Sequence, residues 1–271
     1  MEDLRSIEEL LDNTADVDGE VIGDLLDKAR PQLERALKRI ARPTARFGLI
    51  DSPVGRLMVA ESDRGLLGVR YIDGSEGDAA MISALRQKFD LAEDAAAAAR
   101  IGDEIERSLA GDSEPAAHHP VDYSLVTSPF QRRAFARLRQ VPAGGVVTYQ
   151  ALAAAIGASS GQRAIGNAMA TNPIPIFVPC HRVIRSDGTI GNYGGGVENK
   201  LKLLRAEGFR VDKGNRLPGD AVYGHWQSHI FCRPDCSAVR RADRKKWIIF
   251  TDAGRARGSG MRPCKLCRPA D

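Results

Sequence analysis

The five cysteines of this 271-residue chain fall into two patterns. Four form two close pairs near the end, Cys232-x3-Cys236 and Cys264-x2-Cys267, while Cys180 stands alone. In a reducing compartment, close pairs are typical of metal ligands, and a lone cysteine is either a buried core residue or a nucleophile. Four thiolates at this spacing suit tetrahedral Zn²⁺, which can supply much of the folding energy of a small module.

The segment before Cys180 predicts a rigid loop. Pro173, Pro175 and Pro179 fix φ and exclude a regular helix up to the cysteine. A thiol with a pKa of about 8.5 is a poor nucleophile at neutral pH unless a base takes its proton. His181 follows directly and could act as that base, directly or through one water, with a carboxylate orienting its ring. These residues alone leave a buried structural cysteine open as the alternative.

Two regions of regular structure must position this loop. Residues 46–72 show apolar runs separated by turn signals, which predicts a β-meander with strands at 47–50, 57–60 and 66–72. Helices are expected near 77–89 and 95–110. The polar stretch 111–115 is the first candidate domain boundary.

A second helical region begins at Ser128, a good N-cap, followed by Pro129 at the first helical position. A helix is expected at 149–156, ended by Gly157, and another from 162 to about 171. Helix, short turn and helix is the helix-turn-helix layout, a weak signal by itself. Apolar spacing also predicts helices within residues 1–42, and Pro and Gly mark 211–224 as a linker.

Charge is distributed unevenly. The net charge is +4, yet residues 1–42 sum to −4 (seven basic, eleven acidic) and residues 225–271 to +7 (eleven basic, four acidic). A polyanion near the C-terminal part and a solvated basic surface both explain this asymmetry. The apolar fraction of 43% fits a globular protein, and no apolar run is long enough to span a membrane. The acidic start does not resemble a secretory signal, so a cytoplasmic location is expected.

The motif Pro179-Cys180-His181-Arg182-Val183 resembles the active-site motif of the O6-alkylguanine-DNA alkyltransferases, also called methylated-DNA–protein-cysteine methyltransferases. Further family motifs occur in the family's order and spacing, and weaker similarity extends from about residue 47 to 208. These motifs are Arg163–Met169, Asn172-Pro173, Gly191–Tyr193 and Leu203–Gly208. The resemblance implies an α+β fold with a ribonuclease H-like α/β domain (43–124), a winged helix-turn-helix alkyltransferase domain (125–210), a linker (211–224) and a four-cysteine zinc module (225–271). Residues 1–42 form a helical extension in this scheme.

The resemblance also implies catalytic roles. Cys180 matches the alkyl acceptor, and His181 matches the base that relays the thiol proton through a water. Glu207 matches the carboxylate that holds the histidine, and Asn172 the residue that organises the active-site turn. Tyr149 matches the tyrosine whose hydroxyl protonates the departing guanine. The alternatives for Tyr149 and Glu207 are a core tyrosine and a charge on a helix surface.

DNA contacts follow from the same resemblance. Arg163 matches the finger that enters the stack after the base has been flipped out, an extrusion that costs a few kcal/mol. Small residues such as Ala164 and Gly166 let the helix backbone approach the minor groove. Asn192 and Tyr193 lie in the loop that walls the base pocket, with a purely structural turn as the alternative for Asn192.

The expected function is direct-reversal repair. The alkyl group of O6-alkylguanine, and of O4-alkylthymine, in double-stranded DNA is transferred irreversibly to Cys180 by a monomer that acts once and needs no cofactor for the transfer. A protein that binds lesions without removing them is the first alternative. Such proteins lack the cysteine, whereas this chain retains Cys180, His181, Asn172 and Glu207.

The C-terminal cysteines resemble the zinc module of the adaptive-response Ada proteins, in which the first cysteine of the Cys-x3-Cys pair also accepts a methyl group from DNA phosphotriesters. Cys232 matches that position. The resemblance is partial, because residues 225–230 depart from the pattern, 251–261 lack the usual helical residues, and the module comes last without the activator helix-turn-helix. A structural module that adds DNA affinity is therefore favoured. An alkylation sensor acting through Cys232 remains the second alternative.

Overall fold

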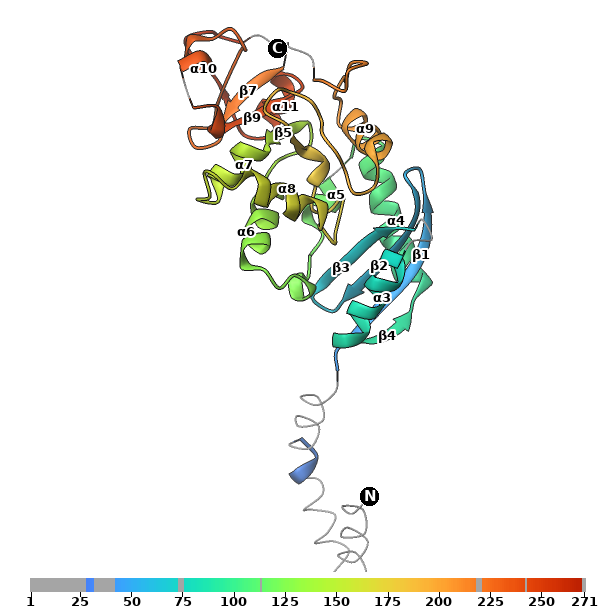
Figure 1. Ribbon diagram of the computed structural model, residues 1–271. Helices are drawn as coiled ribbons and strands as arrows, with labels where there is room; N and C mark the ends of the chain where they lie inside the picture. Colours follow the sequence, from blue (N-terminus) through green and yellow to red (C-terminus); the bar gives the residue numbers. More distant parts are fainter. Residues whose placement is uncertain are drawn as a thin grey trace, which may run out of the picture. The chain divides into compact units, whose positions relative to one another are not determined.

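The computed structural model describes residues 28–31, 42–72, 76–112, 114–217, 221–241 and 243–269 (Figure 1). The chain divides into two compact units, Met1–Pro43 and Thr44–Asp271. In the first unit, residues 28–31 are helical, and the rest of the expected extension 1–42 lies almost entirely outside the described residues. Within the described residues, no helix is long and apolar enough to cross a membrane.

The first sheet of the second unit contains the expected meander. Strands β1 (Thr44–Ser52), β2 (Gly55–Ser62) and β3 (Gly65–Tyr71) pair antiparallel. A fourth strand, β4 (Asp90–Glu93), pairs parallel with β1 and gives the order β3-β2-β1-β4. The expectations did not include β4, because its four residues carry no alternating apolar pattern.

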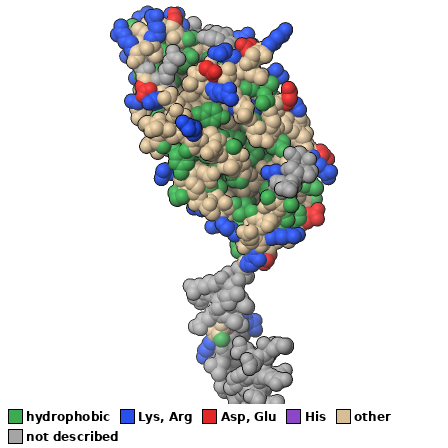
Figure 2. All heavy atoms as spheres, in the orientation of Figure 1, with side chains coloured by type: hydrophobic (Ala, Val, Ile, Leu, Met, Phe, Trp, Pro, Cys, Tyr) green, Lys and Arg blue, Asp and Glu red, His purple; other side chains and the backbone are tan. Residues whose placement is uncertain are grey.

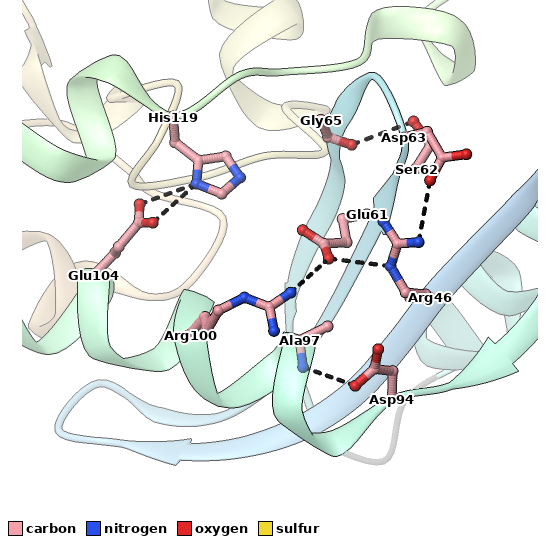
Figure 3. Close-up of polar contacts among 10 residues, drawn as sticks. All are labelled: Arg46, Glu61, Ser62, Asp63, Gly65, Asp94, Ala97, Arg100, Glu104 and His119. Carbon is pink, nitrogen blue, oxygen red and sulfur yellow. Dashed lines mark hydrogen bonds and ion pairs between the residues drawn. The ribbon is translucent and has the colours of Figure 1, made fainter.

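Two helices, α3 (Glu76–Lys88) and α4 (Ala95–Leu109), accompany this sheet as predicted. The side chain of Asp94 caps α4 by accepting the N–H of Ala97 at 2.8 Å. Arg46 on β1 and Arg100 on α4 each lie 3.3 Å from the carboxylate of Glu61 on β2 (Figure 3). These contacts hold α4 against the sheet.

The middle of the chain is mainly helical. It contains α5 (Glu114–His118), a 3₁₀ turn (Tyr123–Leu125), α6 (Pro129–Leu138), β5 (Gly145–Thr148), α7 (Tyr149–Ala155), α8 (Gln162–Ala170), the 3₁₀ turn η2 (Cys180–Arg182), β6 (Val183–Ile184) and α9 (Val197–Ala206). Ser128 caps α6 as predicted, and Thr148 caps α7 by accepting the N–H of Ala151 at 3.0 Å. Gly157 ends α7 with φ +78°, a conformation that favours glycine.

The C-terminal region adds β7 (Val222–His225), β8 (Ile230–Cys232), α10 (Ser237–Arg241), the 3₁₀ turn η3 (Arg244–Lys246), β9 (Trp247–Phe250), α11 (Ala253–Gly258) and β10 (Arg262–Pro263). Its strands continue into the middle region as one sheet of order β10-β8-β7-β9-β5-β6. The segment 251–261, expected to lack helical residues, contains α11. Asp252 starts this short helix by accepting the N–H of Arg255 at 2.8 Å.

The segment 211–224, expected as a linker, makes ordered contacts in the structure. The carboxylate of Asp212 accepts the N–H groups of Gly214 and Arg216, so the polar composition forms a tight turn. The N–H of Leu217 then bonds the carbonyl of Gly188 at 3.1 Å, and β7 begins at Val222, before the expected end of the linker.

One hydrophobic core joins all three regions of the second unit. The largest cluster of buried side chains includes residues from the first sheet, from α6, α7 and the loop before Cys180, and from the C-terminal strands; among them are Leu57, Val69, Phe135, Leu152, Phe177, Phe231, Ile248 and Phe250. The C-terminal region therefore packs on the rest of the unit.

Candidate functional site

Cys180 begins the 3₁₀ turn η2 after the proline-containing loop. The side chain of Asn172 organises this loop. Its Oδ1 accepts the N–H of Ile174 at 3.1 Å, and its Nδ2 donates to the carbonyl of Val178 at 2.8 Å and to Cys180 Sγ at 3.1 Å. Ile176 adopts φ +75°, a strained conformation for a β-branched residue. The surrounding hydrogen bonds hold that conformation, and residues 172–179 form no regular helix, as the prolines predict.

Residues before α6 also contact this loop. The N–H of Val69 on β3 donates to the carbonyl of Pro173 at 2.8 Å. The ring of His119 packs edge-on against Phe177, with centroids 5.2 Å apart, and its Nδ1 lies 3.1 Å from the carboxylate of Glu104 (Figure 3). The first sheet thus helps to position the thiol.

A buried polar chain adjoins Cys180. His181 Nε2 lies 2.8 Å from Glu207 Oε1, and Arg182 donates from Nε and Nη2 to the same oxygen at 2.9 and 2.7 Å. All three side chains are at most 5% exposed. Burial acts to raise the pKa of Glu207, but Arg182 and His181 outweigh it and lower this pKa to about 2.

The ionised carboxylate of Glu207 fixes the histidine tautomer. A carboxylate can only accept, so His181 Nε2 carries the proton and donates it. Burial lowers the pKa of His181, so the ring is neutral at pH 7 and Nδ1 holds a free lone pair. Nδ1 is buried and has no hydrogen-bond partner among the described residues. It is therefore the atom able to accept a proton.

Lys200 is a component of the site that sequence reasoning missed. Its ammonium is fully buried under the site and donates to the carbonyls of Val183, at 2.7 Å, and Ile190. Burial lowers the pKa of Lys200 to about 8. Burial also raises the pKa of Cys180, while Asn172 and the charge of Lys200 act to lower it. No local motif signals this lysine, which reaches the site through the packing of α9.

A cavity of about 750 Å³ opens over Cys180. Besides Cys180, five of the expected residues line it: Tyr149, Arg163, Gly166, Asn192 and Tyr193. Ala164 is exposed on α8 and is not among the lining residues. Hydrophobic side chains gather near the middle of the face drawn in Figure 2, with Lys and Arg side chains scattered around them.

Tyr71 was also missed by the sequence reasoning. Its hydroxyl lies 3.3 Å from that of Tyr193, and the two rings meet edge to face with centroids 6.2 Å apart. A Cβ on Gly195 would lie 2.3 Å from the Tyr71 ring, so only glycine fits there. The end of β3 therefore supports the pocket wall, a contact across 122 positions that no local pattern indicates.

The four C-terminal cysteines meet as predicted. Their sulfur atoms all lie within 4.8 Å of one another. A tetrahedral zinc with Zn–S bonds of about 2.3 Å places its sulfurs roughly 3.8 Å apart, so the cluster fits this ion. The backbone N–H of Cys267 is the main cause that lowers the pKa of Cys264 to about 7, and the N–H of Arg233 donates to Cys267 Sγ. Cys232, Cys236, Cys264 and Cys267 are the residues that would hold the metal.

Two family models match the regions of the chain that contain the two sites. Residues 129–209 match the family described as "6-O-methylguanine DNA methyltransferase, DNA binding domain", and residues 209–270 match "Metal binding domain of Ada". The bifunctional transcriptional activator/DNA repair enzyme Ada of Escherichia coli is 37% identical over 162 residues, which are 60% of this chain and 45% of that protein. The chain thus spans less than half of that relative.

Two further similarities cover most of the other protein. The crystal structure of Mycobacterium tuberculosis OGT in complex with DNA aligns with a TM-score of 0.49 and 31% identity over 60% of this chain and 92% of that chain. The methylated-DNA–protein-cysteine methyltransferase of Rattus norvegicus is 37% identical over 202 residues, which are 69% of this chain and 92% of that protein. Because the match covers nearly the whole relative, the chain belongs to the methylated-DNA–protein-cysteine methyltransferases.

Proposed function

We propose that this protein repairs double-stranded DNA by irreversible transfer of the alkyl group of O6-alkylguanine to Cys180. One observation carries the proposal. A single thiol lies at a cavity of about 750 Å³, and the next residue in the chain is a histidine whose tautomer is fixed by a buried carboxylate. Such a thiol has a route for losing its proton and room for a base in front of it.

The reaction needs four residues. His181 Nδ1 takes the thiol proton of Cys180 through a bridging water, and Glu207 stabilises the imidazolium that forms. The sulfur then attacks the alkyl carbon, an S–C bond forms, and the electrons of the breaking C–O bond pass to the guanine. The hydroxyl of Tyr149 protonates the departing base. Burial raises the pKa of Tyr149, which keeps this hydroxyl protonated and able to donate.

The resulting thioether has no easy hydrolytic route back, so each molecule acts once. The same chemistry fits O4-alkylthymine, whose alkyl group is also bonded to an exocyclic oxygen. No metal is needed for the transfer, because the thiol, the base and the acid all come from the chain. We infer a monomer, since one chain supplies every group named here.

Helices α7 and α8 carry the proposed DNA contact, as the helix-turn-helix of a winged domain that follows a ribonuclease H-like domain. Arg163 is exposed on the first turn of α8 and lines the cavity. It can therefore enter the base stack when a nucleotide is extruded. Ala164 is exposed beside it and Gly166 is partly exposed, and both are small enough for the backbone to approach a narrow groove.

The zinc module extends this contact in our proposal. Turn η3 packs against α7, so the module lies next to the helix-turn-helix. Arg240, Arg241 and Lys246 are exposed, and Lys and Arg side chains gather at the end of the molecule that carries α10 (Figures 1 and 2). Phosphate contacts from this edge add affinity that falls with salt. Cys232 is only 2% exposed, which disfavours its use as a second acceptor from phosphotriesters.

A duplex containing one O6-methylguanine tests the proposal. After incubation, peptide mass measurement should find a gain of about 14 Da on the Cys180 peptide at close to one equivalent per chain. Binding of the lesion duplex without any mass gain overturns the transfer and leaves a lesion binder. A gain on the Cys232 peptide, with a duplex that carries a methylphosphotriester, identifies the alkylation sensor instead.

A further inference from the structure

The zinc module and the alkyltransferase region share a strand pair close to the reaction centre. Strand β9 of the module pairs antiparallel with β5, with Gly145 opposite Phe250 and Val146 opposite Ile249. Just beyond this pair, the N–H of Thr251 donates to the carbonyl of Gly144 at 3.1 Å. The zinc module therefore fixes one side of Gly144.

The other side of Gly144 faces the proton relay. Its N–H donates to Glu207 Oε2 at 3.3 Å in a buried contact, whereas the His181 bond is made to Oε1. Gly144 has φ +72°, which favours glycine, and a Cβ on it would lie 3.0 Å from the aliphatic atoms of Arg255 on α11. One residue of a glycine turn is thus held between the zinc module and the carboxylate.

A second contact supports the same connection. Gly208 follows Glu207 directly, and a Cβ built on it would lie 3.8 Å from Cγ2 of Thr251. Phe250 is fully buried in the core cluster that also contains Cys180. The β9–α11 segment, residues 247–258, therefore contacts the backbone at Gly144 and lies beside Gly208, the two glycines next to the Glu207 carboxylate.

We propose that the β9–α11 segment is a positioning part of the proton relay, acting on Glu207 through Gly144. A Gly-Gly turn without this partner has wide conformational freedom, and a donor on it has no fixed direction. Glu207 sets the orientation of His181, so a displaced donor slows the deprotonation of Cys180. For the alkyl transfer this inference rests on the proposed function, whereas the reactivity of the thiol tests it independently.

The variant Thr251→Pro removes the N–H that holds Gly144. The conservative variant Thr251→Ser keeps that N–H and the hydroxyl that donates to Asp252. Two measurements apply to both: the single-turnover transfer rate as a function of duplex concentration, and the pH dependence of Cys180 alkylation by iodoacetamide, followed on the Cys180 peptide. The second needs no DNA and no lesion, so it remains valid if the proposed repair reaction is wrong.

For Thr251→Pro we expect the rate at saturating duplex to fall roughly tenfold, because the displaced N–H of Gly144 then loses its hydrogen bond to the charged Glu207. The half-saturating duplex concentration should stay within about twofold, because no DNA contact changes. The midpoint of the iodoacetamide profile should move to higher pH, since His181 accepts the thiol proton less readily. Thr251→Ser should restore both values. An unchanged midpoint and saturated rate in a folded Thr251→Pro protein with one zinc per chain overturn the inference.

A second variant covers the case in which Thr251→Pro does not fold. Phe250→Ala loosens β9 without removing a backbone donor, and Phe89→Ala is a matched truncation in the core of the first sheet, away from Gly144. Phe250→Ala should raise the midpoint and Phe89→Ala should not. Equal behaviour of the two variants means that only general stability is involved, and overturns the inference.

Discussion

The protein holds sulfur in two environments that differ in what surrounds the thiol. Around the sulfur of Cys180 lie the amide of Asn172 and the buried ammonium of Lys200, and the neutral His181 follows Cys180 in the chain. Around Cys264 lie three other sulfurs within 4.8 Å. A single thiol beside a base can lose its proton and attack a carbon, whereas four thiolates that share a cation are held as ligands. Surroundings, more than residue type, decide which sulfur reacts.

The largest effect should come from removing the lone thiol. Cys180→Ala should abolish alkyl transfer, because no other thiol is found among the described residues that line the cavity. Affinity for the lesion duplex should remain within about twofold, since the side chain is only 6% exposed and the proposed groove contacts come from α8 and the zinc module. Single-turnover transfer and duplex titration measure the two quantities. Residual transfer in this variant would mean that the two sulfur environments do not differ as argued.

Neutralising Glu207 should give the next largest effect. Glu207→Gln leaves Arg182 buried without its counter-charge and no longer stabilises the imidazolium, so transfer should slow by about 10²-fold or more. Glu198→Gln, at an exposed carboxylate on the same helix, is the matched control and should transfer at the wild-type rate. Single-turnover rates at saturating duplex compare them. A rate within a few-fold of wild type for Glu207→Gln would remove the carboxylate from the relay.

The same variant has a stability signature. The folded pKa of Glu207 is about 2, below its ordinary value of 4.5, so its contribution is present above pH 4.5 and lost as the pH falls towards 2. This contribution is on the order of 3 kcal/mol. Denaturant unfolding at several pH values should show a shallower acid decline for Glu207→Gln than for wild type. Parallel declines would contradict the low pKa.

Removing the metal should affect the second sulfur environment first. A strong chelator, or Cys264→Ser, should lose zinc and unfold the strands around the cluster, because the metal supplies folding energy there. Trp247 packs in that cluster and is 6% exposed, so its fluorescence should shift to the red. Zinc content and the emission spectrum report this independently of repair. An unchanged spectrum after complete zinc loss would show that the fold of the module does not need the metal.

The two sulfur environments also differ in how they could be recognised. The zinc ligands and the Pro-Cys-His motif are short patterns whose residue types and spacing indicate the chemistry. Both were predicted from the sequence. Ser128 begins α6 and Gly157 ends α7 as expected, because caps act locally. Whether each side chain plays its proposed part in catalysis stays a prediction for the experiments above.

Other features depend on packing between distant segments. Tyr71 meets Tyr193 across 122 positions, and Lys200 bonds a carbonyl 17 positions away through the packing of α9; nothing beside either residue in the sequence marks it. Gly144 looks like an ordinary turn glycine until Thr251 and Glu207 are seen on its two sides. The turn at Asp212 was expected as linker because turn residues and linker residues share one composition.

Replacing Lys200 gives the smallest expected effect. The change removes one charge near Cys180 and leaves all five cysteines in place. The ammonium of Lys200 lowers the pKa of Cys180 only while protonated, that is, below about pH 8. Lys200→Met should therefore raise the midpoint of Cys180 alkylation by up to about one pH unit. The difference between the alkylation rates of wild type and Lys200→Met should shrink above pH 8, where the wild-type lysine is also uncharged. Lys202→Met, at an exposed lysine of the same helix, should behave as wild type.

Protein stability provides the check on this charge. Because the folded pKa of Lys200 is about 8 and the unfolded value is 10.5, the unfolded chain binds more protons between these two pH values. Stability from this group therefore rises with pH across that window, and Lys200→Met should lose the rise. Urea unfolding at about pH 7.5, 9 and 10.5 measures the free energy of unfolding across this window. If wild type and Lys200→Met changed in parallel, the ammonium would not be the charge that acts on Cys180.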